Sequence, residues 1–211
     1  EGRETIALTF DDGPDLTYTP RILDILKQKG IRATFYLQGA YLTQAYQDVI
    51  VRILKEGHEI GLHSLDHSQL NKDHGKMAAV YERQVGETEA RLRNMTTTPD
   101  MPNGYTTSLY RPAYGSIRND QIEYFAQQGK KIINWSIDTR DWDKNQSGDF
   151  MARLVGDGAR GGDIVLMHSG GGNRARTVAA LPQMLERLQK RNFRFNQSTV
   201  DLNLSFPNPF G

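Results

Sequence analysis

The chain has 211 residues, 37% of them hydrophobic and 24% charged, which is ordinary for a soluble globular protein. Its formal net charge is +1 and it has no run of Lys or Arg, so charge does not indicate a nucleic-acid or anionic-membrane partner. It has no cysteine, which excludes disulfides, thiol nucleophiles and cysteine-bound zinc. No apolar run approaches the roughly 18 to 20 residues that a membrane helix needs.

Short apolar runs typical of strands alternate along the chain with amphipathic stretches of helical period. The expected strands are Thr5–Phe10, Arg32–Leu37, His58–Leu62, Ser108–Arg111, Lys131–Ile137, Asp163–Met167 and Asn192–Phe195. The expected helices are about Tyr18–Lys29, Tyr41–Glu56, Asp73–Asn94, Asn119–Gln128, Asp149–Ala159 and Arg174–Lys190. This alternation predicts one α/β domain with a parallel sheet, either open and doubly wound or closed as a barrel.

Glycines and one polar segment mark the ends of these elements. Gly30, Gly57 and Gly129 follow three of the helices, where a left-handed residue is expected to end each of them. The segment Met95–Thr107 is rich in Thr, Pro, Gly and Asn and predicts a loop. Because it leads from a helix into a strand, we expect it to lie on the face away from the active site.

Ionisable residues follow five of the expected strands, directly where each strand ends. The segments are Asp11-Asp12, His63–His67, Arg111–Gly115, Asp138–Trp142 and Leu166–His168. They include three of the five histidines in the chain. In a parallel barrel the carboxyl ends of the strands meet at one mouth, so these residues are expected to form one site.

A metal site is the chemistry that these residues favour. His63 and His67 are four residues apart, so a helical turn would place both rings on one face. A carboxylate from Asp11 or Asp12 would complete a set of two histidines and one acid, which leaves positions open for water. The cation would also keep the second aspartate ionised beside it. Taken alone, each motif has a simpler interpretation, such as a turn or a helix cap for Asp-Asp-Gly-Pro.

In the residues and the order of five motifs, the chain resembles the polysaccharide deacetylases, the carbohydrate esterase family that shares the NodB-type domain. The motifs are "TFDDGP" (Thr9–Pro14), "HSLDH" (His63–His67), "RPAYG" (Arg111–Gly115), "DTRDW" (Asp138–Trp142) and "LMH" (Leu166–His168). The resemblance covers about residues 4 to 202, essentially the whole chain. It implies a distorted (β/α) barrel with about seven parallel strands, and hydrolysis of acetyl groups on a polysaccharide.

The same resemblance assigns the metal and the acid–base pair. It implies one divalent ion, Zn²⁺ before Co²⁺ or Ni²⁺, held by Asp12, His63 and His67. It implies Asp11 as the general base that takes a proton from water, and His168 as the general acid that protonates the leaving amine. Because the general acid must be protonated and the general base deprotonated, the rate is predicted to have a bell-shaped dependence on pH.

Five further residues have implied roles around this centre. The resemblance implies that Arg111 holds the base and that Asp141 pairs with the acid. The backbone N–H of Tyr114 is implied as the oxyanion donor, and Trp142 and Leu166 as walls of the acetyl pocket. From the residues alone, the rings of Tyr114 and Trp142 either stack on sugar faces or only pack the barrel mouth. One departure is Ser169, because many bacterial members have Asp after the final His.

The expected substrate is a polymer that contains N-acetylglucosamine: peptidoglycan, chitin or poly-N-acetylglucosamine. The alternatives are an acetylxylan esterase on the same fold and a non-catalytic carbohydrate-binding domain. An unrelated amidohydrolase is disfavoured, because such enzymes place an H-x-H pair on the first strand. We expect a secreted or cell-wall-associated monomer without a nucleic-acid partner. Since the chain begins at Glu1, a signal or anchor upstream is expected to have been removed.

Overall fold

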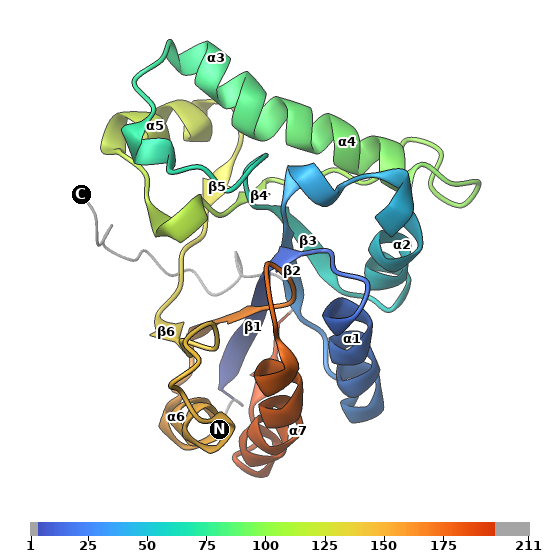
Figure 1. Cartoon of the computed structure of the whole chain (residues 1–211), viewed down its shortest axis with the longest axis vertical. Helices are drawn as coiled ribbons and strands as arrows, with labels where there is room; N and C mark the ends of the chain where they lie inside the picture. The colour runs from blue at the N-terminus through green and yellow to red at the C-terminus, as the bar shows by residue number, and fades with distance from the viewer. Residues whose placement is uncertain (1–3, 197–211) are drawn as a thin grey trace.

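The structure is a computed structural model, which describes residues 4–196. Its centre is a parallel sheet in which seven strands follow the order β5-β4-β3-β2-β1-β7-β6, while β8 pairs with β1 outside this path. The strands are β1 (Thr5–Gly13), β2 (Thr34–Leu37), β3 (Glu59–Leu62), β4 (Leu109–Tyr110), β5 (Lys131–Ile132), β6 (Ile137–Asp138), β7 (Ile164–His168) and β8 (Arg194–Phe195). Helices surround the curled sheet (Figure 1), so the predicted distorted barrel of parallel strands is confirmed.

Strand β1 runs through the middle of the sheet and is buried from Ile6 onward. Its neighbours are β2 on one side and β7 on the other, both parallel to it. A parallel sheet covered by helices on its faces needs such a nearly continuous apolar strand. The register places Asp11 directly beside His168 of β7, and it places Leu62 of β3 beside Tyr110 of β4. Residues at the carboxyl ends of these strands are therefore neighbours in space.

Neighbouring helices contact one another around the sheet. Helices α6 and α7 pack against each other, and α1 packs against α7 (Figure 1). The α-helices are α1 (Tyr18–Lys29), α2 (Gln47–Lys55), α3 (Met77–Tyr81), α4 (Glu87–Thr96), α5 (Asn119–Gln127), α6 (Gly148–Gly158) and α7 (Ala175–Lys190). The 3₁₀ turns are η1 (Gly39–Tyr41), η2 (Gln44–Tyr46), η3 (Leu70–Lys72) and η5 (Ala113–Gly115), and η4 (Glu82–Gly86) is a π-turn.

Several expected boundaries are confirmed and others are corrected. Gly30, Gly57 and Gly129 have positive φ values of 66°, 84° and 81°, as expected for left-handed residues after helices. Two of the three longest expected helices are interrupted: 41–56 consists of two short turns before α2, and 73–94 contains the π-turn between α3 and α4. The expected loop at 95–107 begins later, because α4 continues through Thr96. Residues 197–202 of the expected core lie outside the described residues.

The expected strand Lys131–Ile137 is wrong, because it is two short strands at opposite edges of the sheet. β5 pairs with β4, and β6 pairs with β7, so residues 133–136 cross from one edge to the other. Along this crossing, the carbonyl groups of Ile133 and Asn134 accept hydrogen bonds from the Arg111 side chain at 2.9 and 3.0 Å. The buried guanidinium thus satisfies the carbonyl groups of the chain where it leaves β5. Within residues 4–196 no helix has both the length and the apolarity to cross a membrane.

Candidate metal and catalytic site

Eight of the ten residues singled out in the sequence line one pocket of about 550 Å³ at the carboxyl ends of the strands. They are Asp11, Asp12, His63, His67, Tyr114, Trp142, Leu166 and His168. The other two, Arg111 and Asp141, lie behind the pocket wall, where each holds a lining residue by hydrogen bonds. The expectation that the five strand ends meet at one site is therefore supported by the geometry.

The adjacent carboxylates Asp11 and Asp12 diverge because β1 is irregular at its end. Asp11 is in register with Tyr36 and His168, whereas Asp12 has a positive φ of 68° and interrupts the register. Asp is one of the few residues that tolerate the left-handed region. Glycines after β7 allow this geometry, since a Cβ on Gly171 would lie 2.8 Å from Asp12 Oδ2.

Asp12, His63 and His67 form a cluster with the dimensions of a metal site. Asp12 Oδ1 lies 3.2 Å from the Nε2 atom of each histidine, and all three atoms lie within 4.8 Å of one another. The expectation that a helical turn aligns the histidines is wrong. Residues 63–67 form a loop in which Ser64 and His67 have positive φ values of 59° and 62°. The rings meet at a centroid distance of 5.1 Å because of this tight turn.

The buried polar atoms of this cluster fit a cation. His63 Nδ1 lies 2.8 Å from the carbonyl oxygen of Arg111, which can only accept, so the ring donates there. In neutral His63 the lone pair is then on Nε2, which faces Asp12 Oδ1. That oxygen is buried and has no hydrogen-bond donor. His67 Nε2 lies at the same distance of 3.2 Å from this oxygen. A carboxylate oxygen without a donor, close to two imidazole nitrogens, is a set of metal donors.

Asp11 is fixed by the buried guanidinium of Arg111. Arg111 Nη1 donates to Asp11 Oδ1 at 2.8 Å and to the hydroxyl of Thr9 at 2.7 Å. The Arg111 side chain is completely buried, and its charge lies 4.1 Å from the centre of the Tyr36 ring. The other carboxylate oxygen, Oδ2, lies 3.6 Å from His63 Nε2. Asp11 therefore has one oxygen committed to Arg111 and one oxygen beside the metal cluster.

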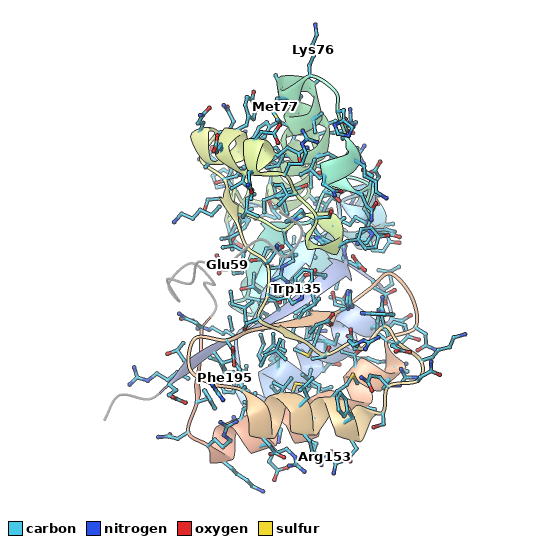
Figure 2. The ribbon with its side chains drawn as sticks, turned by 90° about the vertical axis from the view of Figure 1, so that its left-hand side faces the viewer. Glu59, Lys76, Met77, Trp135, Arg153 and Phe195 are labelled. Atoms are coloured by element: carbon cyan, nitrogen blue, oxygen red, sulfur yellow. The ribbon has the colours of Figure 1, made fainter. Side chains whose placement is uncertain are left out.

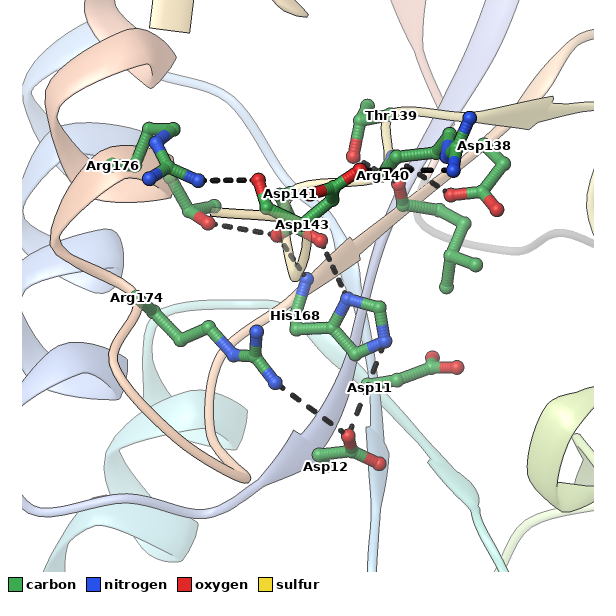
Figure 3. A network of polar contacts seen from close by, with 12 residues as sticks. Asp11, Asp12, Asp138, Thr139, Arg140, Asp141, Asp143, His168, Arg174 and Arg176 are labelled. Atoms are coloured by element: carbon green, nitrogen blue, oxygen red, sulfur yellow. Dashed lines mark hydrogen bonds and ion pairs between the residues drawn. The ribbon is translucent and has the colours of Figure 1, made fainter. Parts of the chain in front are cut away.

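His168 is oriented by Asp141, as shown in Figure 3. His168 Nδ1 donates to Asp141 Oδ1 at 2.6 Å, while Asp141 Oδ2 accepts from the His168 backbone N–H and the Thr177 hydroxyl. Burial lowers the pKa of His168, but the bond to Asp141 and its charge outweigh burial and raise it. Burial likewise raises the pKa of Asp141, and the bond to His168 overrides this and lowers it. The pair thus favours an imidazolium whose Nε2–H points away from Asp141.

The walls of the pocket include both exposed and buried side chains. Tyr114 has a positive φ of 60°, and within the described residues its backbone N–H makes no hydrogen bond. Its ring lies 4.6 Å from that of His67. Tyr114 and Trp142 are 54% and 53% exposed, so both rings present a free surface at the mouth. Leu166 is buried and forms part of the pocket floor.

Three residues that contribute to the site were missed in the sequence. Trp135 lines the pocket from the crossing segment, Thr177 holds Asp141, and Arg174 places Nη2 4.0 Å from Asp12 Oδ2. The one signal for Arg174 was a basic residue two positions after the glycine run that follows β7. Trp135 and Thr177 lie within an expected strand and an expected helix, where nothing distinguishes them from packing residues.

Comparisons with known proteins agree with this architecture. The sequence model described as Polysaccharide deacetylase matches residues 1–133. The peptidoglycan-N-acetylglucosamine deacetylase of Bacillus cereus is 37% identical over 191 residues, which are 90% of this chain and 65% of that protein. The chitooligosaccharide deacetylase of Sinorhizobium fredii is 32% identical over 202 residues, covering 91% of this chain and 89% of that one.

A solved structure of a peptidoglycan N-acetylglucosamine deacetylase, Bc1960, superimposes with a TM-score of 0.82 at 36% identity, over 92% of this chain and 86% of that one. The chain spans just under two thirds of the length of the Bacillus cereus relative above. Sequence and fold agree over most of the chain, and the family model covers the part of the site from Asp11 to Tyr114. The chain therefore belongs to the polysaccharide deacetylase family.

Proposed function

We propose that this protein is a metal-dependent polysaccharide N-deacetylase that hydrolyses the acetamide of an N-acetylglucosamine residue. The observation that carries the proposal is one pocket in which a three-residue metal cluster adjoins a tethered carboxylate and an oriented imidazole. Deacetylases of the same family that are named for peptidoglycan and chitooligosaccharides support the substrate class.

Asp12, His63 and His67 would hold the divalent ion. Two imidazoles and one carboxylate suit Zn²⁺, and Co²⁺ or Ni²⁺ are alternatives. When bound, such an ion lowers the pKa of a water and polarises a carbonyl oxygen. Arg174, close to Asp12 Oδ2, adds a positive charge on the side of Asp12 away from the histidines.

Asp11 would act as the general base through Oδ2, because Oδ1 is occupied by Arg111. A water beside the cluster gives its proton to this oxygen while the water oxygen bonds to the acetyl carbon. The fixed charge of Arg111 keeps Asp11 in one orientation, which reduces the reorganisation that proton transfer requires. The Tyr114 N–H would donate to the developing oxyanion, already oriented before reaction.

His168 would act as the general acid through Nε2. Its Nδ1 is committed to Asp141, so the proton available to the substrate is the one on Nε2. As the carbon–nitrogen bond breaks, that proton goes to the departing nitrogen, and the products are acetate and a free amine on the sugar. Leu166 and Trp142 would enclose the acetyl methyl group, which favours a small acyl group over a larger one.

Acetate release from a panel of polymers tests this function. The panel contains chitin oligomers, peptidoglycan, poly-N-acetylglucosamine and acetylxylan, each with and without added Zn²⁺ or Co²⁺. Metal-stimulated acetate from the N-acetylated polymers is the expected result. Acetate from xylan alone would replace the amide substrate with an ester. No acetate from any polymer, together with retained glycan binding, would indicate the non-catalytic carbohydrate-binding alternative. Because relatives are named for peptidoglycan, a polymer of the cell wall, we also propose that this protein acts outside the cell.

A further inference from the structure

A second hollow, of about 730 Å³, adjoins the catalytic pocket and shares Trp142 and Arg174 with it. Three basic residues line this hollow: Lys144, Arg174 and Arg176. The one acidic residue among its lining residues is Asp141, whose oxygens already accept hydrogen bonds from His168 and Thr177. The hollow therefore has a surplus of positive charge directly beside the site of the reaction.

Arg174 is a buried cation with unused hydrogen-bonding capacity. Its residue is 7% exposed, its Nε donates to the Gly170 carbonyl at 2.7 Å, and its Nη2 lies 4.0 Å from Asp12 Oδ2 (Figure 3). In the described part of the chain no acceptor lies within hydrogen-bond distance of its Nη1 or Nη2. A buried charge with so few partners is expensive unless another anion satisfies it.

The other two basic residues keep their charge available to a ligand. Arg176 donates to the carbonyl oxygens of Asp143 and Lys144 at 2.6 and 3.0 Å, so it fixes the loop that follows β6 without meeting a carboxylate. Lys144 is exposed on that loop, and no ion pair or hydrogen bond of its ammonium occurs within residues 4–196. The hollow also lies at the N-terminus of α7, which begins at Ala175 and adds partial positive charge.

We infer that this hollow is a subsite for a carboxylate carried by the sugar next to the one that is deacetylated. The inference rests on the proposed function and narrows its substrate to an acidic glycan. Peptidoglycan carries carboxylates on its peptide stems, and on its lactyl groups where the stem is absent, whereas chitin and poly-N-acetylglucosamine carry none. Trp142, shared by both hollows and half exposed, provides the surface across which the glycan passes from one to the other.

The test compares substrates that have the same length and differ in charge. They are chitotetraose, the N-acetylglucosamine–N-acetylmuramic acid tetrasaccharide with free lactyl carboxylates, the same tetrasaccharide with peptide stems, and both acidic compounds after amidation. Acetate release gives kcat/KM for each, and titration calorimetry gives its affinity. Wild-type protein is expected to prefer the acidic compounds to their amidated forms, and the compound with the larger preference identifies which carboxylate binds.

Variants of the subsite then separate charge recognition from catalysis. Lys144→Gln is expected to lower kcat/KM about two- to fivefold for the acidic compounds, as a solvent-exposed ion pair implies. Its values for chitotetraose and the amidated compounds should stay at the wild-type level. Arg174→Gln, which removes a buried charged donor, is expected to lower affinity for the acidic compounds about tenfold or more. Lys76→Gln makes the same change of charge at the far tip beside α3 (Figure 2) and should alter nothing.

The outcomes distinguish this inference from the proposed function. If wild-type protein treats acidic and amidated compounds alike, or if Lys144→Gln affects neutral and acidic compounds equally, the subsite is refuted while the deacetylase function stands. If no compound releases acetate but affinity still depends on the carboxylate and on Lys144, the proposed function is refuted and the subsite stands. The Lys144 side chain is exposed and makes no hydrogen bond or ion pair within residues 4–196, so Lys144→Gln is expected to fold. This variant therefore tests the subsite even if Arg174→Gln does not fold.

Discussion

Replacing Asp11 with Asn tests the general base and the buried ion pair in one protein. Asn keeps the size of Asp11 and can still accept from Arg111 Nη1, but it removes the negative charge opposite a completely buried guanidinium. Losing one partner of a buried pair costs about 3 to 5 kcal/mol, and the remaining hydrogen bond places the expected loss at the lower end, about 3 kcal/mol. Urea unfolding of the metal-loaded protein measures this loss.

The same variant should lose most of its turnover. General base catalysis contributes about 10²- to 10⁴-fold in rate, so kcat for Asp11→Asn is expected to fall by that factor. This corresponds to about 3 to 5 kcal/mol in the activation barrier. Because Asp11 lies outside the Asp12, His63 and His67 cluster, the metal content of the variant is expected to equal that of the wild type.

Asp24→Asn is the matched control, because Asp24 forms an ion pair with Arg52 on the surface. It should change the free energy of unfolding by less than about 1 kcal/mol, as exposed pairs do, and leave kcat unchanged. Near wild-type turnover by Asp11→Asn would refute its role as the base. Loss of the metal from that variant would instead show that Asp11 is a ligand.

Three further results are expected. In Asp141→Asn the pKa of His168 should fall, because the bond and charge that raise it are gone; the alkaline limb of the kcat–pH profile should therefore move to lower pH, and an unmoved limb would contradict His168 as the acid. Gly171→Ala should weaken metal binding in equilibrium dialysis, since its Cβ would lie 2.8 Å from Asp12 Oδ2. Gly129→Ala has a similar positive φ of 81° and open space, so it should bind metal normally; equal binding by both variants would count against the close packing on Asp12. Dialysis against a chelator should abolish acetate release and added Zn²⁺ should restore it, whereas a chelator-resistant enzyme would rule out metal dependence.

The fold was predictable where local signals were strong and consistent. The α1 helix begins and ends where the apolar period and Gly30 predict, and β1 and β7 follow their apolar runs. The break within Lys131–Ile137 was not predictable, because that run has the composition of a single strand. β5 pairs with β4 and β6 pairs with β7, and between them the carbonyl groups of Ile133 and Asn134 bond to the side chain of Arg111. These hydrogen bonds join residues that are far apart in the sequence, so neither the composition nor the hydrophobic periodicity of the segment predicts them.

The site was predictable as a set of residues but not as a geometry. Motifs that end successive parallel strands indicated His63, His67 and one of Asp11 and Asp12, and the family resemblance implied Asp12. The sheet register explains why the ends of these strands are close together. The conformation of residues 63–67 was assigned to a helical turn, because spacing alone does not reveal a loop with two left-handed residues. Arg174 escaped notice for a related reason: its approach to Asp12 depends on how the glycines after β7 fold back.

Anomalous diffraction from a crystal of the zinc-loaded protein, recorded on both sides of the zinc absorption edge, shows which side chains hold the ion. One strong peak is expected about 2.0 to 2.2 Å from His63 Nε2, His67 Nε2 and Asp12 Oδ1. Both carboxylate oxygens of Asp11 are expected to lie beyond bonding distance from that peak. No peak between these three side chains, or one bound by Asp11 in place of Asp12, would contradict the assignment of ligand and base.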